Sequence, residues 1–383
     1  MFEIAVGDPQ KVGDPISAHI VYTVSTKTSS SDFKKSAFSV LRRYSDFLWL
    51  HEALVSNNPG VVVPPLPEKV SFGRFEGSFV ESRRLALNKC IQKIANHPRL
   101  CRDPDFKLFL ESDSFALDIK HRKVDGSQGT GLMVTIGSSI AGPKFYETDE
   151  WFDKKKVYLD SLESQLKALV KSIEGVAKQR TEVITATMEF SEAIGALAAS
   201  NLSRHLSNSL SVLAEAEKKA KEFQEIEAKD DTVTILGTVE EYIRLISSVR
   251  LTFSSRIKAF HAMKSSEAER NRVRMMHEKT LRQRGLDRQS MMPLHREIGA
   301  VEAKAQEART EYEDVTKLIK SEVGRFESER IDDFKASLEA YLEGMITRQN
   351  EVGHFFLSDC SRLFMIAPGC RSFIRGRSIN SSC

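Results

Sequence analysis

Hydrophobic and polar positions alternate in the first part of the chain and follow a longer period in the rest. Alternate residues in one early segment are apolar: Ile16, Ala18, Ile20, Tyr22 and Val24. A period of two is typical of a half-buried antiparallel strand. Met1–Gln10 alternates in the same way, and a polar turn leads to a further apolar run at Phe38–Arg43. These three segments predict a small antiparallel sheet.

Two helices are expected after these strands. Ser45 is a suitable N-cap for a helix whose apolar residues are Phe47, Leu48, Leu50 and Leu54. Phe79–Asn96 carries Leu87, Ile91 and Ile94 on one face and is followed by Pro98. A small sheet followed by helices predicts an α+β module of about 120 residues.

The remainder has the helical spacing of a coiled coil. The first such stretch carries Leu159, Leu162, Leu166, Leu169, Ile173, Val176, Val183, Phe190, Ile194 and Leu197. Breaks are expected near Lys229–Asp231 and Gly285–Pro293, which predicts an all-α antiparallel bundle of three helices of about 55–75 residues. Further apolar positions indicate a second buried face and hence a dimer: Leu202, Leu206, Leu210, Leu213 and Ile226.

Proline and charge divide the chain at the same place. Eight of the 11 prolines precede Asp105, whereas one, Pro293, falls between Lys144 and Ala367. An internal proline costs a helix about 3 kcal/mol, so the second part is free to be helical. Residues 1–122 carry 17 Lys/Arg and 14 Asp/Glu, which accounts for the whole net charge of +3. Val124–Pro143, rich in Gly, Ser and Thr, is a linker between them.

Three basic clusters of the first module suit a phosphorylated sugar. Arg42-Arg43-Tyr44 ends a strand and opens a helix, a proline-rich loop ends in Lys69, and Arg83-Arg84 lies on the next helix. Arginine binds phosphate in a bidentate manner, lysine adds a point charge, and an aromatic ring packs on a sugar face. Each cluster alone is typical of a solvated surface.

In this order the clusters resemble those of a phox-homology (PX) domain. The resemblance covers about residues 1–120 and rests on Arg-Arg-Tyr-Ser-Asp-Phe at 42–47, Pro-Pro-Leu-Pro-Glu-Lys at 64–69 and Phe-Val-Glu-Ser-Arg-Arg at 79–84. It implies that Arg43 binds the 3-phosphate of phosphatidylinositol 3-phosphate, that Tyr44 packs under the inositol, and that Lys69 meets the 1-phosphate. Arg83 would bind the 4- and 5-hydroxyls, with Arg84 as the alternative register.

Two apolar segments are candidates for membrane insertion. The first flanks the proline-rich loop and includes Val62, Val63 and Leu66, for which packing beneath the loop is the alternative. The second lies in the linker, where Leu132, Met133, Ile136 and Ile140 recur at helical spacing opposite uncharged polar residues. Its glycines favour the alternative of an unstructured linker.

A third candidate is a basic turn between the second and third long helices. Residues 264–296 hold nine basic and four acidic side chains. The candidate membrane-binding residues among them are Arg270, Arg272, Arg274, Lys279, Arg282, Arg284 and Arg288. A basic residue near an anionic membrane contributes about 1 kcal/mol, whereas a solvated helix face is the alternative. Gly285 and Pro293 interrupt the helix and argue against a DNA-reading basic zipper, so no nucleic-acid partner is expected.

The whole arrangement resembles the sorting nexins that carry a Bin/Amphiphysin/Rvs (BAR) domain, and within them the retromer-associated branch. The implied organisation is a PX domain at 1–122, a linker with an amphipathic helix at 123–147, a BAR domain at 148–357 and an unmatched, disordered tail at 358–383. The implied function is binding to phosphatidylinositol 3-phosphate on the cytosolic face of endosomes and formation of membrane tubules for retrograde sorting. Implied partners are a homo- or heterodimeric PX-BAR chain and the retromer cargo-recognition trimer.

The sequence departs from the family pattern at two places, and it lacks several motifs of enzymes. The family usually has a long N-terminal segment, whereas this chain starts at the first PX strand, and the third helix is expected to end early near residue 357. No Walker loop, dinucleotide glycine motif or His-Glu-x-x-His is present, so we expect no enzyme, no catalytic residues, no cofactor and no metal. Five scattered cysteines fit a reducing compartment. A phosphoinositide-targeted scaffold that does not bend membranes is the alternative function, and a structural coiled-coil rod is a second.

Overall fold

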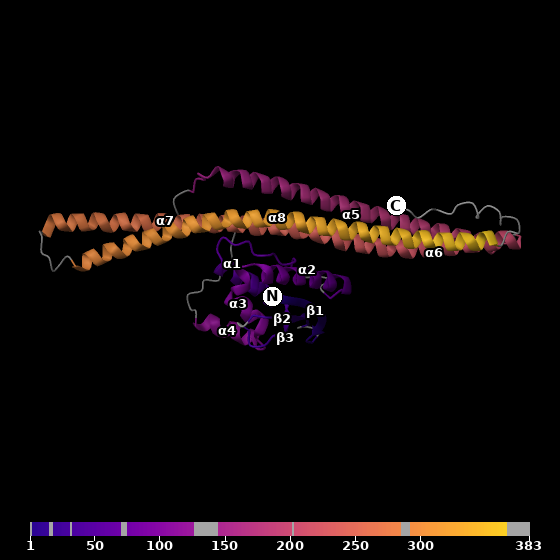
Figure 1. The fold of residues 1–383 in the computed structure, drawn as a ribbon, viewed down its shortest axis with the longest axis horizontal. Helices are drawn as coiled ribbons and strands as arrows, with labels where there is room; N and C mark the ends of the chain where they lie inside the picture. The colour runs from indigo at the N-terminus through magenta and orange to yellow at the C-terminus, as the bar shows by residue number, and fades with distance from the viewer. Residues whose placement is uncertain are drawn as a thin grey trace. The chain divides into compact units, whose positions relative to one another are not determined.

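The fold combines a small sheet, short helices and four long helices. The computed structural model describes residues 2–14, 18–30, 33–69, 75–125, 145–200, 203–284 and 292–365 (Figure 1). It divides into two compact units, one formed by Met1–Leu162 with Ile243–Glu329 and the other by Glu163–Tyr242 with Arg330–Cys383. Each unit is described by itself. The predicted fold class, an α+β module followed by an all-α region, is confirmed.

The sheet of the first unit has the expected three antiparallel strands. They are β1 (Phe2–Val12), β2 (His19–Thr28) and β3 (Ala37–Arg43), in the order β1-β2-β3. The pairing of β1 with β2 is irregular between Gly7 and Gln10, where β1 has a bulge. Tyr22 and Val24 are buried at alternate positions of β2, which is the period-two pattern of the sequence.

Helices cover this sheet and supply most of the core. They are α1 (Tyr44–Asn57), α2 (Gly77–Asn96), the short 3-10 helix η1 (Leu100–Arg102), α3 (Pro104–Glu111) and α4 (Phe115–Asp125). Their fully buried side chains include Phe47, Leu50 and Leu54 of α1, Leu87 and Ile91 of α2, and Phe106 and Phe109 of α3. Burial of each such side chain stabilises the fold by about 1.5–3 kcal/mol.

Helix α1 begins one residue earlier than the expected N-cap at Ser45. The Asp46 carboxylate accepts a hydrogen bond from the backbone N–H of Arg43 at 2.9 Å. This bond satisfies a backbone donor at the start of the helix. The first helical residue is therefore Tyr44, directly after β3, and Ser45 lies inside the helix.

The long helices differ from the prediction in where they break. They are α5 (Glu150–Ala198), α6 (Arg204–Asp231), the π-helical segment η2 (Thr232–Leu236), α7 (Gly237–Arg284) and α8 (Met292–Met365). The expected break at Lys229–Asp231 is wrong, because the chain stays helical there and widens into η2. The observed break follows Ala198, where the hydroxyls of Ser200 and Ser207 donate to the carbonyls of Leu197 and Ala198.

The end of α8 is also different from the prediction. The helix continues to Met365, so the expected boundary at residue 357 falls inside a helix and 358–365 are not an unstructured tail. Residues 366–383 lie outside the described residues. In the first unit α7 and α8 are antiparallel, because Arg274 pairs with Glu302 while Arg256, earlier in α7, contacts Tyr312 and Thr316, later in α8.

The end of the expected linker is anchored in the first unit. Glu147 accepts a bond from Nη1 of Arg256 at 2.6 Å, and both side chains are buried. The Arg256 guanidinium also lies 3.9 Å from the ring centroid of Phe152 at the start of α5. Because a buried charge needs this pairing, Glu147 belongs to the folded helical part rather than to a linker that ends at 147.

Glu322 of α8 joins the α+β module to the helices within the first unit. Its carboxylate is 5% exposed, and its Oε2 accepts the Val62 N–H at 3.0 Å and lies 3.2 Å from Nε2 of His97 and 2.6 Å from Nη2 of Arg325. Gly60, at a φ of +87°, approaches the same helix so closely that an added Cβ would lie 3.2 Å from Val315. Glycine is required there by both its backbone angle and the available space.

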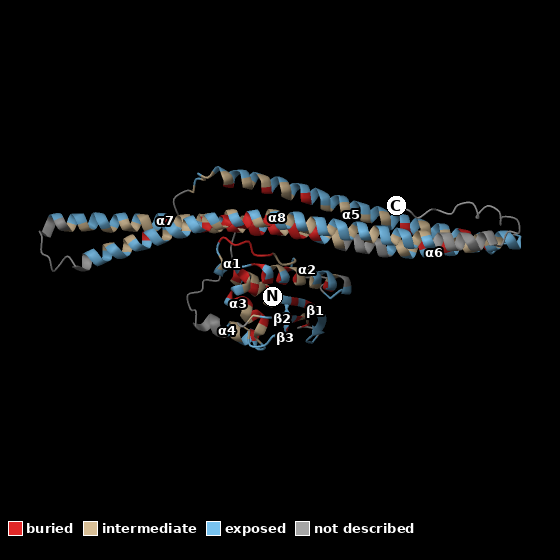
Figure 2. Cartoon of the chain, viewed as in Figure 1, coloured by how far each residue is buried: buried red, intermediate tan, exposed pale blue. Residues whose placement is uncertain are grey.

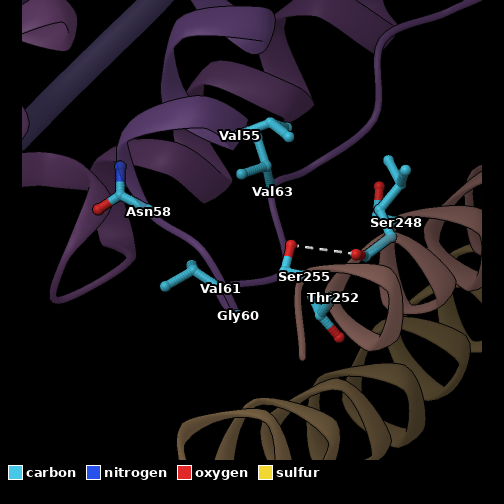
Figure 3. A pocket seen from close by; sticks show the side chains of 9 residues that line it. Val55, Asn58, Gly60, Val61, Val63, Ser248, Thr252 and Ser255 are labelled. Atoms are coloured by element: carbon cyan, nitrogen blue, oxygen red, sulfur yellow. Dashed lines mark hydrogen bonds between the residues drawn. The ribbon is translucent and has the colours of Figure 1, made fainter. Parts of the chain in front are cut away.

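The same contact encloses a small hollow between the loop after α1 and helix α7. Figure 3 shows Val61 and Val63 on one side and Ser248 and Thr252 on the other. Its volume of about 10 Å³ is enough for one water molecule at most. We regard it as a packing gap of this contact and not as a ligand site.

Replacement of Glu322 by glutamine is expected to destabilise the first unit in a pH-dependent way. Burial raises the pKa of Glu322, but the bonds from His97 and Val62 and the charge of Arg325 outweigh burial and hold the pKa below its ordinary value. A carboxyl with a lowered folded-state pKa stabilises the fold above its unfolded pKa and loses this effect as pH falls through the folded value. At neutral pH we expect Glu322→Gln to lower the free energy of unfolding by about 1–3 kcal/mol.

The measurement is thermal unfolding of wild type and variant between about pH 7 and pH 3. The difference in Tm should narrow on acidification, and a difference that stays constant over this range would contradict the assignment. Glu329→Gln is the matched control on the same helix, because the ion pair of Glu329 with Arg325 is partly exposed. Its effect should be about 0.5 kcal/mol or less.

Candidate headgroup site

Three elements bring the predicted site residues to one place. Arg43 is the last residue of β3 and Tyr44 the first of α1, so the strand-to-helix junction fixes both. Lys69 is exposed at the end of the extended segment 62–69, and Arg83 lies on α2. The proline rings of this segment restrict its backbone, which lowers the entropy cost of holding Lys69 in place.

Arg83 is the centre of the cluster. Its guanidinium carbon lies 4.5 Å from the ring centroid of Tyr44 and 4.3 Å from that of Phe79. Its Nη2 donates to the Glu68 carbonyl at 2.9 Å, and the Tyr44 hydroxyl donates to the Pro67 carbonyl at 2.6 Å. Arg83 and Tyr44 therefore both hold the end of the loop that carries Lys69.

One donor in this cluster has no partner. Nε of Arg83 is buried without a hydrogen-bond acceptor among the described residues. A buried unpaired donor is costly and is seldom retained without a reason. A ligand hydroxyl or phosphate oxygen would satisfy it.

The neighbouring arginines 42 and 43 have opposite environments. Arg42 is 2% exposed and donates to the carbonyls of Phe109, Leu41 and Ser112, and its burial lowers its pKa to about 10. Arg43 has a half-exposed side chain, and Asp46, at 3.3 Å, is its one ion-pair partner among the described residues. An exposed pair of this kind contributes little and exchanges readily for a phosphate. Arg42 is structural, whereas Arg43 is available to a ligand.

The geometry favours Arg83 over Arg84 as the site residue. Arg84 pairs with Glu81 at 2.6 Å and donates to the Val6 carbonyl at 2.8 Å. Glu81 belongs to α2 itself and Val6 to β1, so neither contact is with Tyr44 or the proline-rich loop. The sequence analysis could not choose between Arg83 and Arg84 as the site residue, because they are adjacent on the same helix.

Val62 and Val63 were predicted to insert into a membrane, but in the structure both are buried inside the first unit. They are 5% and 2% exposed, and the Val62 N–H is bonded to Glu322. Packing in the first unit, the alternative, accounts for them. Leu66 is half-buried against the core of the α+β module, and Leu132, Met133, Ile136 and Ile140 lie outside the described residues.

The predicted basic turn divides into paired and unpaired side chains. Arg274 pairs with Glu302, and Arg270 donates to Asn271. Arg272, Lys279 and Arg282 are exposed on α7, with no ion pair to any described residue. Arg284 ends α7, but its side chain is outside the described set, as is all of Arg288.

Two further searches concern metals and membrane spans. Within the described ranges no three His, Cys, Asp or Glu side chains cluster as a metal site would require. Cys90 is buried in the core and His97 contacts Glu322. None of the described helices combines the length and apolar character needed to cross a membrane.

The fold and site define a class of protein: an α+β module with a cation-lined aromatic site, followed by long antiparallel helices. Residues 30–113 match the PX domain family, and residues 127–357 match the family described as Vps5 C terminal like. Sorting nexin-2 of Bos taurus is 35% identical over 91% of this chain and 70% of its own length. This chain belongs to the sorting nexin family with PX and Vps5 C-terminal-like regions.

Two other similarities agree with this assignment. The vacuolar protein sorting-associated protein vps5 of Schizosaccharomyces pombe is 34% identical over 92% of this chain, which spans 63% of that protein. The cryo-EM structure of the SNX-BAR Mvp1 tetramer has a TM-score of 0.59 at 17% identity and covers 94% of this chain and 99% of its own. At that identity the second similarity supports the fold alone.

Substitution of Arg42 and Arg43, one at a time, should distinguish the arginine that stabilises the fold from the arginine that is available to a ligand. Arg42→Ala removes the donors to three carbonyls, of which that of Phe109 is buried, and it removes a packed side chain, so the free energy of unfolding should fall by about 3 kcal/mol or more. Arg43→Ala keeps the backbone N–H that binds Asp46 and should cost about 0.5 kcal/mol or less. Urea unfolding of the two variants measures this, and equal losses would contradict the division.

Proposed function

We propose that this chain is a peripheral membrane protein that binds phosphatidylinositol 3-phosphate on endosomes. Arg43 would bind the 3-phosphate, Tyr44 would pack under the inositol and Lys69 would meet the 1-phosphate, while Arg83 would bind the 4- and 5-hydroxyls. The observation that carries this proposal is the position of Arg83, stacked on Tyr44 and bonded to the loop of Lys69 with its Nε unpaired. The PX family match supports the same ligand class.

The long helices supply the second part of the proposal. As a BAR dimer, the protein would sense or generate curvature and form tubules for retromer-dependent endosome-to-Golgi sorting. Its partners would be a PX-BAR chain, as homo- or heterodimer, and the retromer cargo-recognition trimer. The names of the relatives, sorting nexin-2 and vps5, support a sorting role. The alternative is a phosphoinositide-targeted scaffold that recruits proteins without bending the membrane.

An apolar face in the second unit supports dimerisation. Five apolar residues of α5, spaced seven residues apart and so aligned in one row along the helix, are exposed: Leu169, Val176, Val183, Phe190 and Leu197. The sequence analysis placed this row in the main seam and the spare apolar face on the following helix. In the second unit, however, the buried residues of α5 are Leu166, Ile184, Ile194 and Ala198, and on the following helix Leu210 and Leu213 are half-buried. A heptad row left in water is typical of an interface with another helix.

Vesicle sedimentation tests the headgroup site. Arg43→Ala and Arg83→Ala should each weaken binding to vesicles with phosphatidylinositol 3-phosphate by about 10–100-fold, since each removes charge-assisted bonds. Arg84→Ala, the neighbouring control, should bind nearly as wild type. A larger loss for Arg84→Ala would place the register one residue later. Unchanged binding in all three would overturn the site.

Light scattering and electron microscopy test the helical part. Val183→Glu with Phe190→Glu places two charges in the exposed row, so the mass measured in solution should fall to that of one chain. Thr185→Glu, exposed on another face of α5, is the control. Wild type should turn vesicles into tubules and the double variant should not. A monomeric wild type would overturn the homodimer, and bound but spherical vesicles would favour the scaffold.

A further inference from the structure

Strand β3 leaves one edge of the small sheet open. The strand order β1-β2-β3 makes β1 and β3 the two edge strands. An edge strand presents backbone N–H and C=O groups that can pair with another extended chain. Proteins usually block such edges, and the two edges of this sheet differ in that respect.

The β1 edge is closed by side chains of α2. The Val6 N–H donates to Oδ1 of Asn88 at 2.9 Å, and the Val6 carbonyl accepts from Nη1 of Arg84 at 2.8 Å. The Ile4 carbonyl accepts from Nε2 of Gln92 at 3.3 Å. The outward backbone groups of β1 at these positions are therefore already bonded, and its bulge interrupts the edge further.

The hydrogen-bond pattern between β2 and β3 identifies the outward groups of β3. The Thr28 N–H donates to the Ser36 carbonyl at 2.9 Å, one step beyond the end of the paired strands. Hydrogen-bonded pairs alternate along an antiparallel ladder, so the even-numbered residues of β3 bond to β2. The odd-numbered residues direct their backbone groups away from β2: Ala37, Ser39, Leu41 and Arg43.

Side chains close this edge at one end only. The Arg43 N–H donates to Asp46, and the Leu41 carbonyl accepts from Nη1 of Arg42 at 2.9 Å. No hydrogen bond from a described residue reaches the Leu41 N–H or the outward backbone groups of Ser39. We name the stretch Ala37–Leu41 the β3 open edge.

The β3 open edge also lacks the protection that side chains usually provide. It contains no proline and no charged residue, although both are common on edge strands. Exposed and buried residues alternate along it, as Figure 2 colours them, and Leu41 is 57% exposed beside its cross-strand neighbour Thr23. An apolar side chain on an added strand would cover Leu41.

Cations gather at the start of the β3 open edge. Lys34 and Lys35 directly precede the strand, are exposed and form no ion pair with any described residue. Lys107 of α3 lies 5.6 Å from the ring centroid of Phe33 at the same end. A carboxylate here, that of Glu111, accepts the Lys34 N–H at 2.7 Å. Among the described residues the three lysines outweigh this carboxylate, so this end of the edge is positive.

We propose that the β3 open edge binds an extended, acidic segment of a partner protein by strand addition. The outward groups of Ala37, Ser39 and Leu41 pair with the main chain of the segment. An apolar residue of the segment covers Leu41, and its acidic residues meet Lys34 and Lys35. In this mode main-chain hydrogen bonds provide affinity, and alternate side chains provide specificity.

The chemistry of the edge selects this kind of partner. A row of backbone donors and acceptors at strand spacing is matched by another extended main chain. A helix has its own backbone groups bonded internally and does not match it. The lysines then favour acidic over basic segments. The inference does not depend on the proposed lipid binding, because the edge uses none of the headgroup residues.

Peptide display on the full chain tests the proposal. The probe is a library of peptides of about ten residues, with Val, Ile, Thr and Tyr at the central positions and Asp or Glu at both ends. Wild type should enrich peptides from this library over a matched library with Lys at both ends. The affinity of enriched peptides, measured by fluorescence anisotropy, should fall as salt rises, because the end contacts are exposed.

Substitutions on the edge separate backbone pairing from side-chain contacts. Ser39→Pro removes an outward N–H and should weaken the enriched peptides about tenfold or more, while the ladder to β2 keeps its bonds. Ser39→Thr is the matched control, since it keeps the N–H and should bind as wild type. Leu41→Ser should weaken binding about fivefold through loss of the apolar contact. Lys34→Ala with Lys35→Ala should weaken it at low salt and not at high salt.

Amide hydrogen exchange provides a measurement that does not need a variant. A bound peptide should slow exchange of the Ser39 and Leu41 amides in wild type, because both become donors to the added strand. The Val6 amide, on the closed edge, is the internal control and should exchange at an unchanged rate. This keeps the test decisive if Ser39→Pro lowers the stability of the sheet.

Three outcomes would overturn the inference. The first is that no acidic peptide is enriched, and the second is that Ser39→Pro and Ser39→Thr bind enriched peptides equally well. The third is a lower oligomeric mass of Ser39→Pro in light scattering without peptide, which would assign the edge to a contact between two copies of this chain. Binding of Ser39→Pro to vesicles with phosphatidylinositol 3-phosphate should equal that of wild type, so the lipid proposal and this one fail separately.

Discussion

The buried carboxylate of Glu322 is the interaction on which the arrangement of the first unit depends. A lone carboxylate in such an interior would cost several kcal/mol, so it persists only because His97, Arg325 and the Val62 N–H all bind it. Val62 is the start of the proline-rich loop. At the other end of that loop, the Pro67 and Glu68 carbonyls accept bonds from Tyr44 and Arg83. The loop is thus held at both ends, and Lys69 is positioned before any ligand arrives.

The arginines of the first unit show how burial assigns different roles to one residue type. Arg42 and Arg256 are almost fully buried, and their donors are taken by carbonyls, a carboxylate and hydroxyls. Such side chains stabilise the fold and have no capacity left for a ligand. Arg43 retains an exposed guanidinium, and Arg83 retains a buried Nε without an acceptor. Arg43 and Arg83 differ from the structural arginines because part of each guanidinium is still able to bind a ligand. The sequence pattern does not predict this difference.

The periodicity of apolar residues predicted most elements of the fold. The predictions failed where the structure depends on contacts that this periodicity does not reveal. The strands and helix α2 follow the alternation and spacing of their own residues. Val62 and Val63 were expected near lipid, because Glu322, which binds the Val62 N–H, lies 260 residues away in sequence and no local pattern announces it. The break after Ala198 was missed because it depends on serine hydroxyls that bond helix carbonyls, whereas an acidic pair at Asp230 and Asp231 suggested a break where the backbone only widens into η2.

The pairing of cations with carboxylates determines where the chain is positively charged, although its net charge is small. Several cations of α7 and α8 in the first unit have a carboxylate within 4 Å, so they add little field beyond their neighbours: Arg250, Arg256, Arg274 and Lys304. Arg272, Lys279 and Arg282 are exposed and form no ion pair with any described residue, and the same holds for Lys258 and Lys317.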